Sequence, residues 1–221
     1  MADGRAARGR FIVVEGGDGS GKGGVIEALS ARLTAADHDL LVTREPGGTD
    51  EGLKLRELLL SAEGAVWDQG AELLLMTAAR IQHVKRVIAP ALAAGRIVLC
   101  DRFVGSTLAY QGAGRGISES LIRGLHRDLV DDLWPDITVL LDVDPRVGLA
   151  RSRARLSDAE LDEGRFEDLD IGFHDRVRGG FLDQAQHDVE RTLVIDAARP
   201  ADQVRADAIT QVLARLDLLP S

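Results

Sequence analysis

Several glycines and one lysine near the start of the chain have the spacing of a phosphate-binding loop. Gly16 is followed after four residues by Gly21 and Lys22, directly after a short apolar run. In such a loop the backbone N–H groups turn toward phosphate oxygens, the next helix begins with partial positive charge, and the lysine reaches the β- and γ-phosphates. The positions expected to bind ATP or GTP are Gly16, Gly17, Asp18, Gly19, Ser20, Gly21, Lys22, Gly23 and Gly24.

One position of this loop departs from the usual pattern. The lysine is normally followed by Ser or Thr, whose hydroxyl binds Mg²⁺, but this chain has Gly23 there. Because Mg²⁺ retains several waters in proteins, a water is able to take the place of the hydroxyl.

Charged residues also follow two later apolar runs. Arg44 precedes a Pro-Gly-Gly turn, and Asp101 and Arg102 follow the run Ile97 to Cys100. An acidic residue at the end of a buried strand is typical of a site that holds Mg²⁺ directly or through water, and arginine binds phosphate in a bidentate manner. Taken alone, Asp101 and Arg102 are equally consistent with an ordinary salt bridge.

Short apolar runs alternate with longer amphipathic segments, which predicts how these residues are positioned. Such alternation is typical of βαβ units, with a parallel sheet covered by helices on both faces. We expect one α/β domain over residues 1–221, with a frayed tail at 1–10. The expected strands are 11–14, 40–42, 97–100, 137–141 and 193–195, and the expected helices are 24–36, 51–60, 69–92, one that begins at Asp144-Pro145, and one through Val204 to Leu216.

Composition narrows the range of partners. The formal net charge of −9 argues against binding a nucleic-acid polymer, whose affinity comes from basic surface. The single cysteine, Cys100, ends an apolar run and is expected to be a buried thiol in a reducing compartment, the cytoplasm. The N-terminal residues lack the apolar stretch of a signal peptide, and no apolar run is long enough to cross a membrane.

A run of arginines has two interpretations. Arg151, Arg153 and Arg155 stand two residues apart, and Arg165 follows. They form either a solvated helix face or a lid that delivers guanidinium groups to a phosphoryl group. Composition alone favours a plain solvated loop over residues 152–170.

With these clusters in this order, the chain resembles bacterial thymidylate kinase over nearly its whole length. The combination of TREPGGT and DRFxxSTLAYQG after a P-loop is specific. The resemblance implies a P-loop nucleoside monophosphate kinase fold with a lid at about residues 151–168. It also implies transfer of the γ-phosphate of ATP to dTMP, giving dTDP and ADP for dTTP synthesis, with Mg²⁺, in a cytoplasmic homodimer. The segments that carry it are FIVVEGGDGSGKGG, TREPGGT, ELLLMTAARIQHV, CDRFVGSTLAYQGAGRGI, LLDVDPRVGLARSRAR and GRFED.

The resemblance assigns roles to single residues. Asp18 matches a carboxylate that meets the sugar 3′-hydroxyl, and Arg44 and Arg102 match ligands of the dTMP phosphate. Asp101 matches the acidic residue near the metal, and Arg151 is expected at the ATP site. The other positions expected to bind dTMP are Pro46, Met76, Arg80, Ser106, Thr107, Tyr110 and Gln111.

Some of these positions determine which nucleotide fits. Arg80 matches the arginine that reads the thymine edge, and Thr107 and Gln111 lie where the family contacts the base. Tyr110 matches the ring that packs on the deoxyribose and disfavours a 2′-hydroxyl. Met76 stands where the family usually has a phenylalanine that stacks on thymine, so we expect weaker base discrimination.

The family supplies a catalytic arginine either from the P-loop or from the lid. Because Gly19 occupies the P-loop position, the resemblance implies a lid arginine: Arg153 first, then Arg155 and Arg151. The remaining catalytic residues it implies are Lys22, Asp101 and Arg102.

Two other functions remain open at this point. One is a kinase for another nucleotide, against which TREPGGT and Arg80 argue. The other is a nucleotide-binding protein with little turnover, such as a sensor. Gly23 supports that second alternative, whereas Lys22, Asp101 and Arg102 oppose it.

Overall fold

The computed structural model describes residues 8–60, 66–156 and 164–216. Its centre is one five-stranded sheet in the order β2-β3-β1-β4-β5, in which every pair of neighbours is parallel. Each predicted strand is present and extends slightly beyond its predicted limits. The strands are β1 (Phe11–Gly16), β2 (Leu40–Arg44), β3 (Ile97–Asp101), β4 (Ile137–Asp142) and β5 (Thr192–Asp196).

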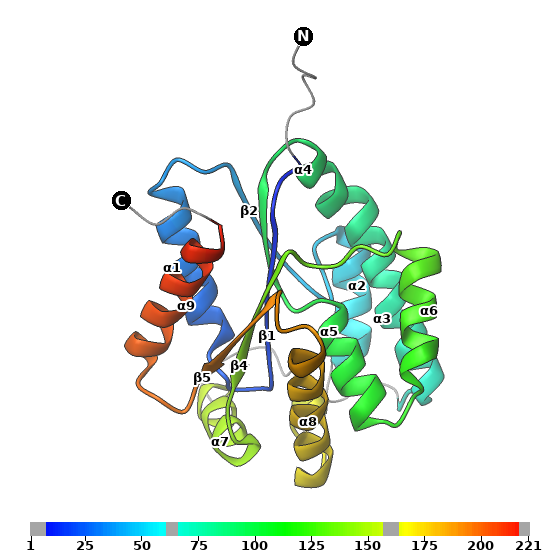
Figure 1. Ribbon diagram of the computed structural model, residues 1–221. Helices are drawn as coiled ribbons and strands as arrows, with labels where there is room; N and C mark the ends of the chain where they lie inside the picture. Colours follow the sequence, from blue (N-terminus) through cyan, green and yellow to red (C-terminus); the bar gives the residue numbers. More distant parts are fainter. Residues whose placement is uncertain (1–7, 61–65, 157–163, 217–221) are drawn as a thin grey trace.

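Helices cover both faces of this sheet (Figure 1). On one face α1 (Lys22–Thr34) and α9 (Ala201–Arg215) pack against the strands, and buried Val, Leu and Ile side chains fill the space between them. The opposite face carries α8 (Ile171–His187) and the helices from α2 (Asp50–Leu60) to α6 (Glu119–Leu129). The predicted parallel α/β sheet is therefore confirmed.

The long helix predicted over residues 69–92 consists of three parts. These are α3 (Gln69–His83), a π-helical turn η1 (Val84–Ile88) and α4 (Ala89–Ala93). Pro90 lies in the first turn of α4 and has no N–H to donate back along the helix, so the regular hydrogen-bond ladder cannot continue through it.

A second π-helical segment follows β3. The short helix α5 (Val104–Thr107) continues into η2 (Leu108–Gly114), which carries Tyr110 and Gln111. Wide turns of this kind occur frequently at functional sites.

The helices α6 and α8 were not predicted from the sequence. In α8 the pair Gly179-Gly180 interrupts the apolar pattern. The structure explains Gly180, because a Cβ at that position would come within 2.6 Å of the Ala113 side chain on η2. The glycine therefore lets α8 approach the π-helical segment closely.

The chain start differs from the expected frayed tail where it is described. Gly9 is buried and its N–H donates to the Leu92 carbonyl, 2.8 Å away, while Arg8 pairs with Asp136. For residues 8–10 the expectation is wrong, and residues 1–7 lie outside the described part of the chain.

Within the described ranges, no helix is long and apolar enough to cross a membrane.

Because all five strands run in the same direction, their carboxyl ends lie on one edge of the sheet. The P-loop follows β1 there, and Arg44 and Asp101 are the last residues of β2 and β3. In α/β folds of this type, ligands bind in the crevice at that edge.

Candidate active site

A cavity of about 480 Å³ lies at the carboxyl edge of the sheet. Residues from the P-loop, β2, α3, β3, α5 and η2 meet around it. It brings together most of the residues that the sequence singled out: Asp18, Gly19, Gly21, Lys22, Gly23, Arg44, Pro46, Met76, Arg80, Asp101, Arg102, Ser106, Thr107, Tyr110 and Gln111. Gly16, Gly17, Ser20, Gly24, Arg151 and Arg153 are not among its lining residues.

The Lys22 ammonium is held by the loop that precedes it. Its Nζ donates to the carbonyl oxygens of Gly16 at 3.1 Å and of Gly17 at 2.9 Å. Burial, followed by the nearby positive charge of Arg102, lowers the pKa of Lys22 to about 8. A phosphate in the loop would add negative charge to that of Asp101 and Asp18 and would stabilise the charged lysine.

Arg102 is the centre of the opposite wall. Its Nη2 donates to Asp18 Oδ1 at 2.6 Å, and its Nη1 donates to the Gly16 carbonyl at 3.1 Å and to Ser106 Oγ at 3.2 Å. Its backbone has a φ of 65°, which is uncommon for a residue with a side chain. Arg102 is thus fixed in place by the P-loop and by α5.

Tyr110 and Asp18 belong to the same cluster. The tyrosine hydroxyl donates to Asp18 Oδ2 at 2.9 Å, and the Arg102 guanidinium lies over the tyrosine ring at 5.2 Å. Burial alone would raise the pKa of Asp18, but the charges of Arg102 and Lys22 hold it below its usual range. Asp18 is therefore a carboxylate at neutral pH.

Glu15 supports this cluster from behind and was not identified from the sequence. It is 2% exposed, and its carboxylate accepts from the backbone N–H groups of Phe103 and Ser106 and from Ser106 Oγ at 2.6 Å. Burial raises the pKa of Glu15. The only sequence signal is an acidic residue inside an otherwise apolar strand.

A second buried cluster lies around Arg80. Glu45 accepts from Arg80 Nε at 2.7 Å and from His83 Nδ1 at 3.0 Å, and Arg80 Nη2 donates to Thr107 Oγ1 at 2.9 Å. Arg80 is only 4% exposed. The roles of Glu45 and His83 were not predicted, although Glu45 lies inside the TREPGGT segment.

Another unpredicted carboxylate, Glu72, organises the next part of the wall. It is 0% exposed and accepts from Gln111, Arg115 and Arg165. Arg165, which belongs to the run considered for a lid, also donates to the Leu59 carbonyl at 2.9 Å. Its guanidinium is therefore bound to α2 and α3 rather than directed at the cavity.

The proposed lid is described only in part. Arg151 on α7 (Pro145–Leu156) donates to the carbonyls of Ala197 at 2.8 Å and Ala198 at 3.3 Å, and Arg153 is exposed. The Arg155 side chain and residues 157–163 lie outside the described part of the structure.

Gly19 could not carry a side chain in this structure. It has a φ of 69°, and a Cβ there would overlap the backbone carbonyl of Gly148 on α7. The P-loop and α7 therefore meet backbone to backbone.

Asp101 meets the requirements of a residue that holds Mg²⁺. Its Oδ1 is buried and, among the described residues, has no hydrogen-bond partner. The described ranges contain no group of three His, Cys, Asp or Glu side chains able to hold a metal. Mg²⁺ does not need one, because it is usually bound by one or two carboxylates, substrate phosphates and water.

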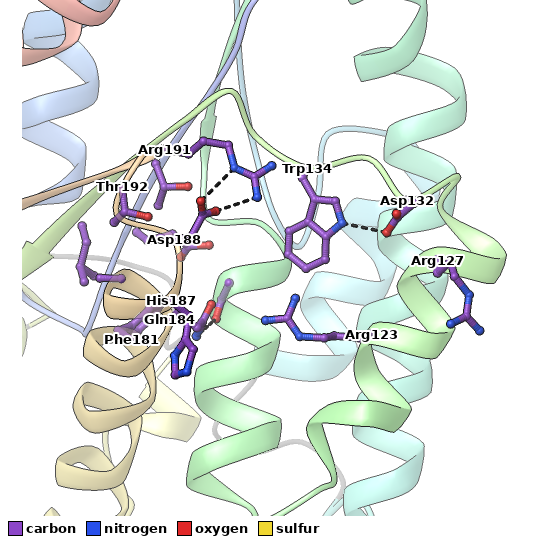
Figure 2. Close-up of a pocket in the computed structure, with 15 residues that line it drawn as sticks. Arg123, Arg127, Asp132, Trp134, Phe181, Gln184, His187, Asp188, Arg191 and Thr192 are labelled. Carbon is purple, nitrogen blue, oxygen red and sulfur yellow. Dashed lines mark hydrogen bonds and ion pairs between the residues drawn. The ribbon is translucent and has the colours of Figure 1, made fainter.

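A second cavity, of about 430 Å³, lies between α6 and α8. Figure 2 shows Arg191 paired with Asp188, Trp134 bonded to Asp132, and Arg123 beside the Trp134 ring. Arg191 pairs with Asp188 at 2.9 Å, Trp134 Nε1 donates to Asp132 at 2.8 Å, and Arg123 lies over the Trp134 ring at 5.0 Å. None of the residues predicted to bind ATP or dTMP lines it.

A family model described as thymidylate kinase matches residues 14–208. The chain belongs to the thymidylate kinase family. It is thereby an ATP-dependent nucleoside monophosphate kinase, and the predicted P-loop kinase fold is confirmed.

Individual relatives in the thymidylate kinase family agree. The thymidylate kinase of Cereibacter sphaeroides is 58% identical over 202 residues, which cover 91% of this chain and 93% of the relative. That of Thermomicrobium roseum is 50% identical over 209 residues, covering 93% and 96%. The crystal structure of thymidylate kinase from Ehrlichia chaffeensis matches with a TM-score of 0.75 at 36% identity and covers 93% of this chain and 99% of that one.

Proposed function

We propose that this chain transfers the γ-phosphate of ATP to dTMP, forming dTDP and ADP. The observation that carries the proposal is a single cavity with the P-loop lysine on one side and Arg102, Tyr110, Arg80 and Gln111 on the other. Such a cavity brings a donor triphosphate and an acceptor nucleotide together. Positioning of this kind, with compensation of charge, is the main part of catalysis in phosphoryl transfer.

The acceptor phosphate would lie between Arg44 and Arg102. Both arginines line the cavity, and Arg102 is already fixed by Asp18 and Ser106. The acceptor is an anionic phosphate oxygen at neutral pH, so no general base is required. The arginines and Lys22 instead offset the repulsion between two polyanions.

The sugar and base would extend along the cavity toward α3. Tyr110 and Asp18 are joined by a hydrogen bond and present a ring and a carboxylate to the deoxyribose. Met76 lines the same cavity, where its thioether is able to pack on a flat base.

Asp101 would hold Mg²⁺, directly or through water, because its buried Oδ1 has no partner among the described residues. When bound, the metal would neutralise charge on the phosphoryl oxygens. Gly23 leaves room for a water in place of the usual hydroxyl, since a Cβ there would meet no atom within 4 Å.

We assign the catalytic arginine to the lid, because a side chain at Gly19 would collide with Gly148. Among the lid arginines we keep the order that the resemblance implies: Arg153 first, then Arg155 and Arg151. We expect the double variant Arg153→Ala, Arg155→Ala to lose on the order of 10³-fold in kcat. Single-turnover rates measure this loss, and near-normal rates in the double variant would contradict the assignment.

The proposed chemistry is tested by ADP release with ATP and Mg²⁺, offering dTMP, dUMP, dCMP, dAMP and dGMP in parallel. We expect turnover with dTMP, weaker turnover with dUMP, and little with the other nucleotides. A stronger reaction with another acceptor would show a different nucleotide kinase, and ATP binding without ADP formation would show a protein with little turnover.

Two further aspects of the resemblance remain proposals. A homodimer is supported by the apolar side chains exposed on α2, α3 and α6, which include Leu58, Leu74 and Leu121. Sedimentation equilibrium measures the oligomeric state directly.

Function in the cytoplasm is supported by the buried thiol of Cys100, the only cysteine.

A further inference from the structure

Glu72 on α3 is a fully buried carboxylate that lies behind the wall of the nucleotide cavity. It accepts from Gln111 Nε2 at 2.8 Å, from Arg165 Nη2 at 2.9 Å and from Arg115 Nη2 at 3.2 Å. Of these four residues only Gln111 lines the cavity. Any effect of Glu72 on a bound nucleotide therefore passes through Gln111.

The charge of Glu72 determines which way the Gln111 amide points. A carboxylate that pairs with two guanidinium groups only accepts hydrogen bonds. Gln111 must therefore turn its NH₂ group toward Glu72, and its carbonyl oxygen Oε1 becomes the other end of the amide. No residue in the described ranges donates to Oε1. Position 111 therefore offers the cavity a hydrogen-bond acceptor.

Arg80 offers a donor to the same cavity. Its Nε is bound to Glu45 and its Nη2 to Thr107, while Nη1 donates to no residue that the structure describes. Among pyrimidines, a donor beside an acceptor matches a carbonyl oxygen next to an N–H, as in thymine and uracil. Cytosine presents an amino group next to an unprotonated nitrogen, which is the opposite pattern.

We propose that Glu72 is a positioning residue for base specificity, because it locks Gln111 as an acceptor and so makes the site reject cytosine. The proposal rests on the proposed function as a kinase that acts on dTMP. Discrimination of this kind is strong when a buried polar group would otherwise be left unpaired.

The test replaces Glu72 by an amide of the same size. In Glu72→Gln the new side chain both donates and accepts, so Gln111 is released to present its NH₂ group to the base. We expect the ratio of kcat/KM for dTMP to that for dCMP to fall at least tenfold, while KM for ATP stays within twofold of the original value.

Arg115→Gln is the matched control. It removes a guanidinium from the same carboxylate and leaves the Gln111 hydrogen bond in place, so the dTMP-to-dCMP ratio should stay within twofold. An equal fall in both variants would show that Glu72 only supports the structure and would overturn the proposal.

Gln111→Met tests the proposal without removing the buried charge. It removes the acceptor but keeps the size of the side chain, so the dTMP-to-dCMP ratio should fall as it does in Glu72→Gln. This second variant tests the proposal even if Glu72→Gln does not fold. An unchanged ratio in Gln111→Met would overturn the proposal. Absence of dTMP turnover in the unaltered protein would instead refute the proposed function, before any variant is compared.

Discussion

Two cavities of nearly equal size differ in how their charged groups are satisfied. The cavity at the sheet edge, of about 480 Å³, contains buried arginines and carboxylates. Hydrogen bonds to other protein groups hold these side chains on one side, and the side chains can still form hydrogen bonds on the other. In the cavity between α6 and α8, of about 430 Å³, Arg191 and Asp188 are 48% and 38% exposed and pair with each other. Volume therefore does not identify a site, whereas incompletely satisfied buried charge does.

Glu15 lines one of the two cavities and is hydrogen-bonded to a residue that lines the other. It lines the cavity between α6 and α8, and its carboxylate accepts hydrogen bonds from Ser106, which lines the nucleotide cavity. Because Glu15 is bound on the side of Ser106, it adds rigidity to the nucleotide cavity and offers little to the other one.

The largest expected effect comes from removing the positive charge of the P-loop. Lys22→Met should lower kcat by on the order of 10³-fold, because one charged contact to the transferring phosphoryl group is lost. Lys85→Met, which changes an exposed lysine on η1, is the matched control and should retain full activity. Steady-state ADP release measures both rates. Equal rates in the two variants would contradict the conclusion that incompletely satisfied buried charge identifies the site.

Lys22→Met should lower activity but raise the stability of the folded protein. The pKa of Lys22 in the folded protein is about 8, against 10.5 as its ordinary value, so the folded state releases this proton first as pH rises. The cost of burying the charge is therefore complete below pH 8 and disappears toward pH 10.5. At pH 7 Lys22→Met should raise the free energy of unfolding by about 3 kcal/mol.

Urea denaturation between pH 6 and 10.5 measures this gain, which should shrink at the upper end of the range. Lys85→Met should show no comparable gain at any pH. A stabilisation by Lys22→Met that does not depend on pH would show that improved packing, rather than charge, is responsible.

A smaller effect is expected from restoring a hydroxyl to the P-loop. A Cβ at Gly23 would meet no atom within 4 Å, so Gly23→Ser should fit without strain. We expect the Mg²⁺ concentration needed for half-maximal activity to fall severalfold, since a protein oxygen replaces a water. Gly23→Ala is the control, and an equal change in that variant would point to helix stability instead.

The smallest effect should come from the cavity between α6 and α8. Arg191→Ala removes an exposed ion pair with Asp188, and such pairs contribute about 0–1 kcal/mol. The kcat/KM for dTMP should stay within about twofold of the original value because the lost charge was already satisfied. A large loss of activity would show that the two cavities are coupled.

The sequence was sufficient for features that depend on local pattern. The strands, the P-loop and the residues at the strand ends follow from apolar runs and glycine spacing, and the structure brings most of them to one cavity. Glu72 could not be found in this way, because its partners Gln111 and Arg165 lie 39 and 93 residues away along the chain.

Regions where two backbone segments approach closely also could not be predicted from the sequence. Helix α8 was missed since Gly179-Gly180 lowers helix propensity, and the reason for Gly180 lies on η2, in another part of the chain. The assignment of site roles beyond this geometry remains a prediction from the family resemblance.

The contact between Gly19 and Gly148 bears on how such kinases diverge. An arginine introduced at position 19 by one mutation would meet the α7 backbone, so it would disturb both the P-loop and α7 before it could assist catalysis. A lineage with this packing therefore cannot gain an arginine at position 19 in one neutral step. Helix α7 must first shift away from the P-loop, and an enzyme with only one of these two changes would be less fit.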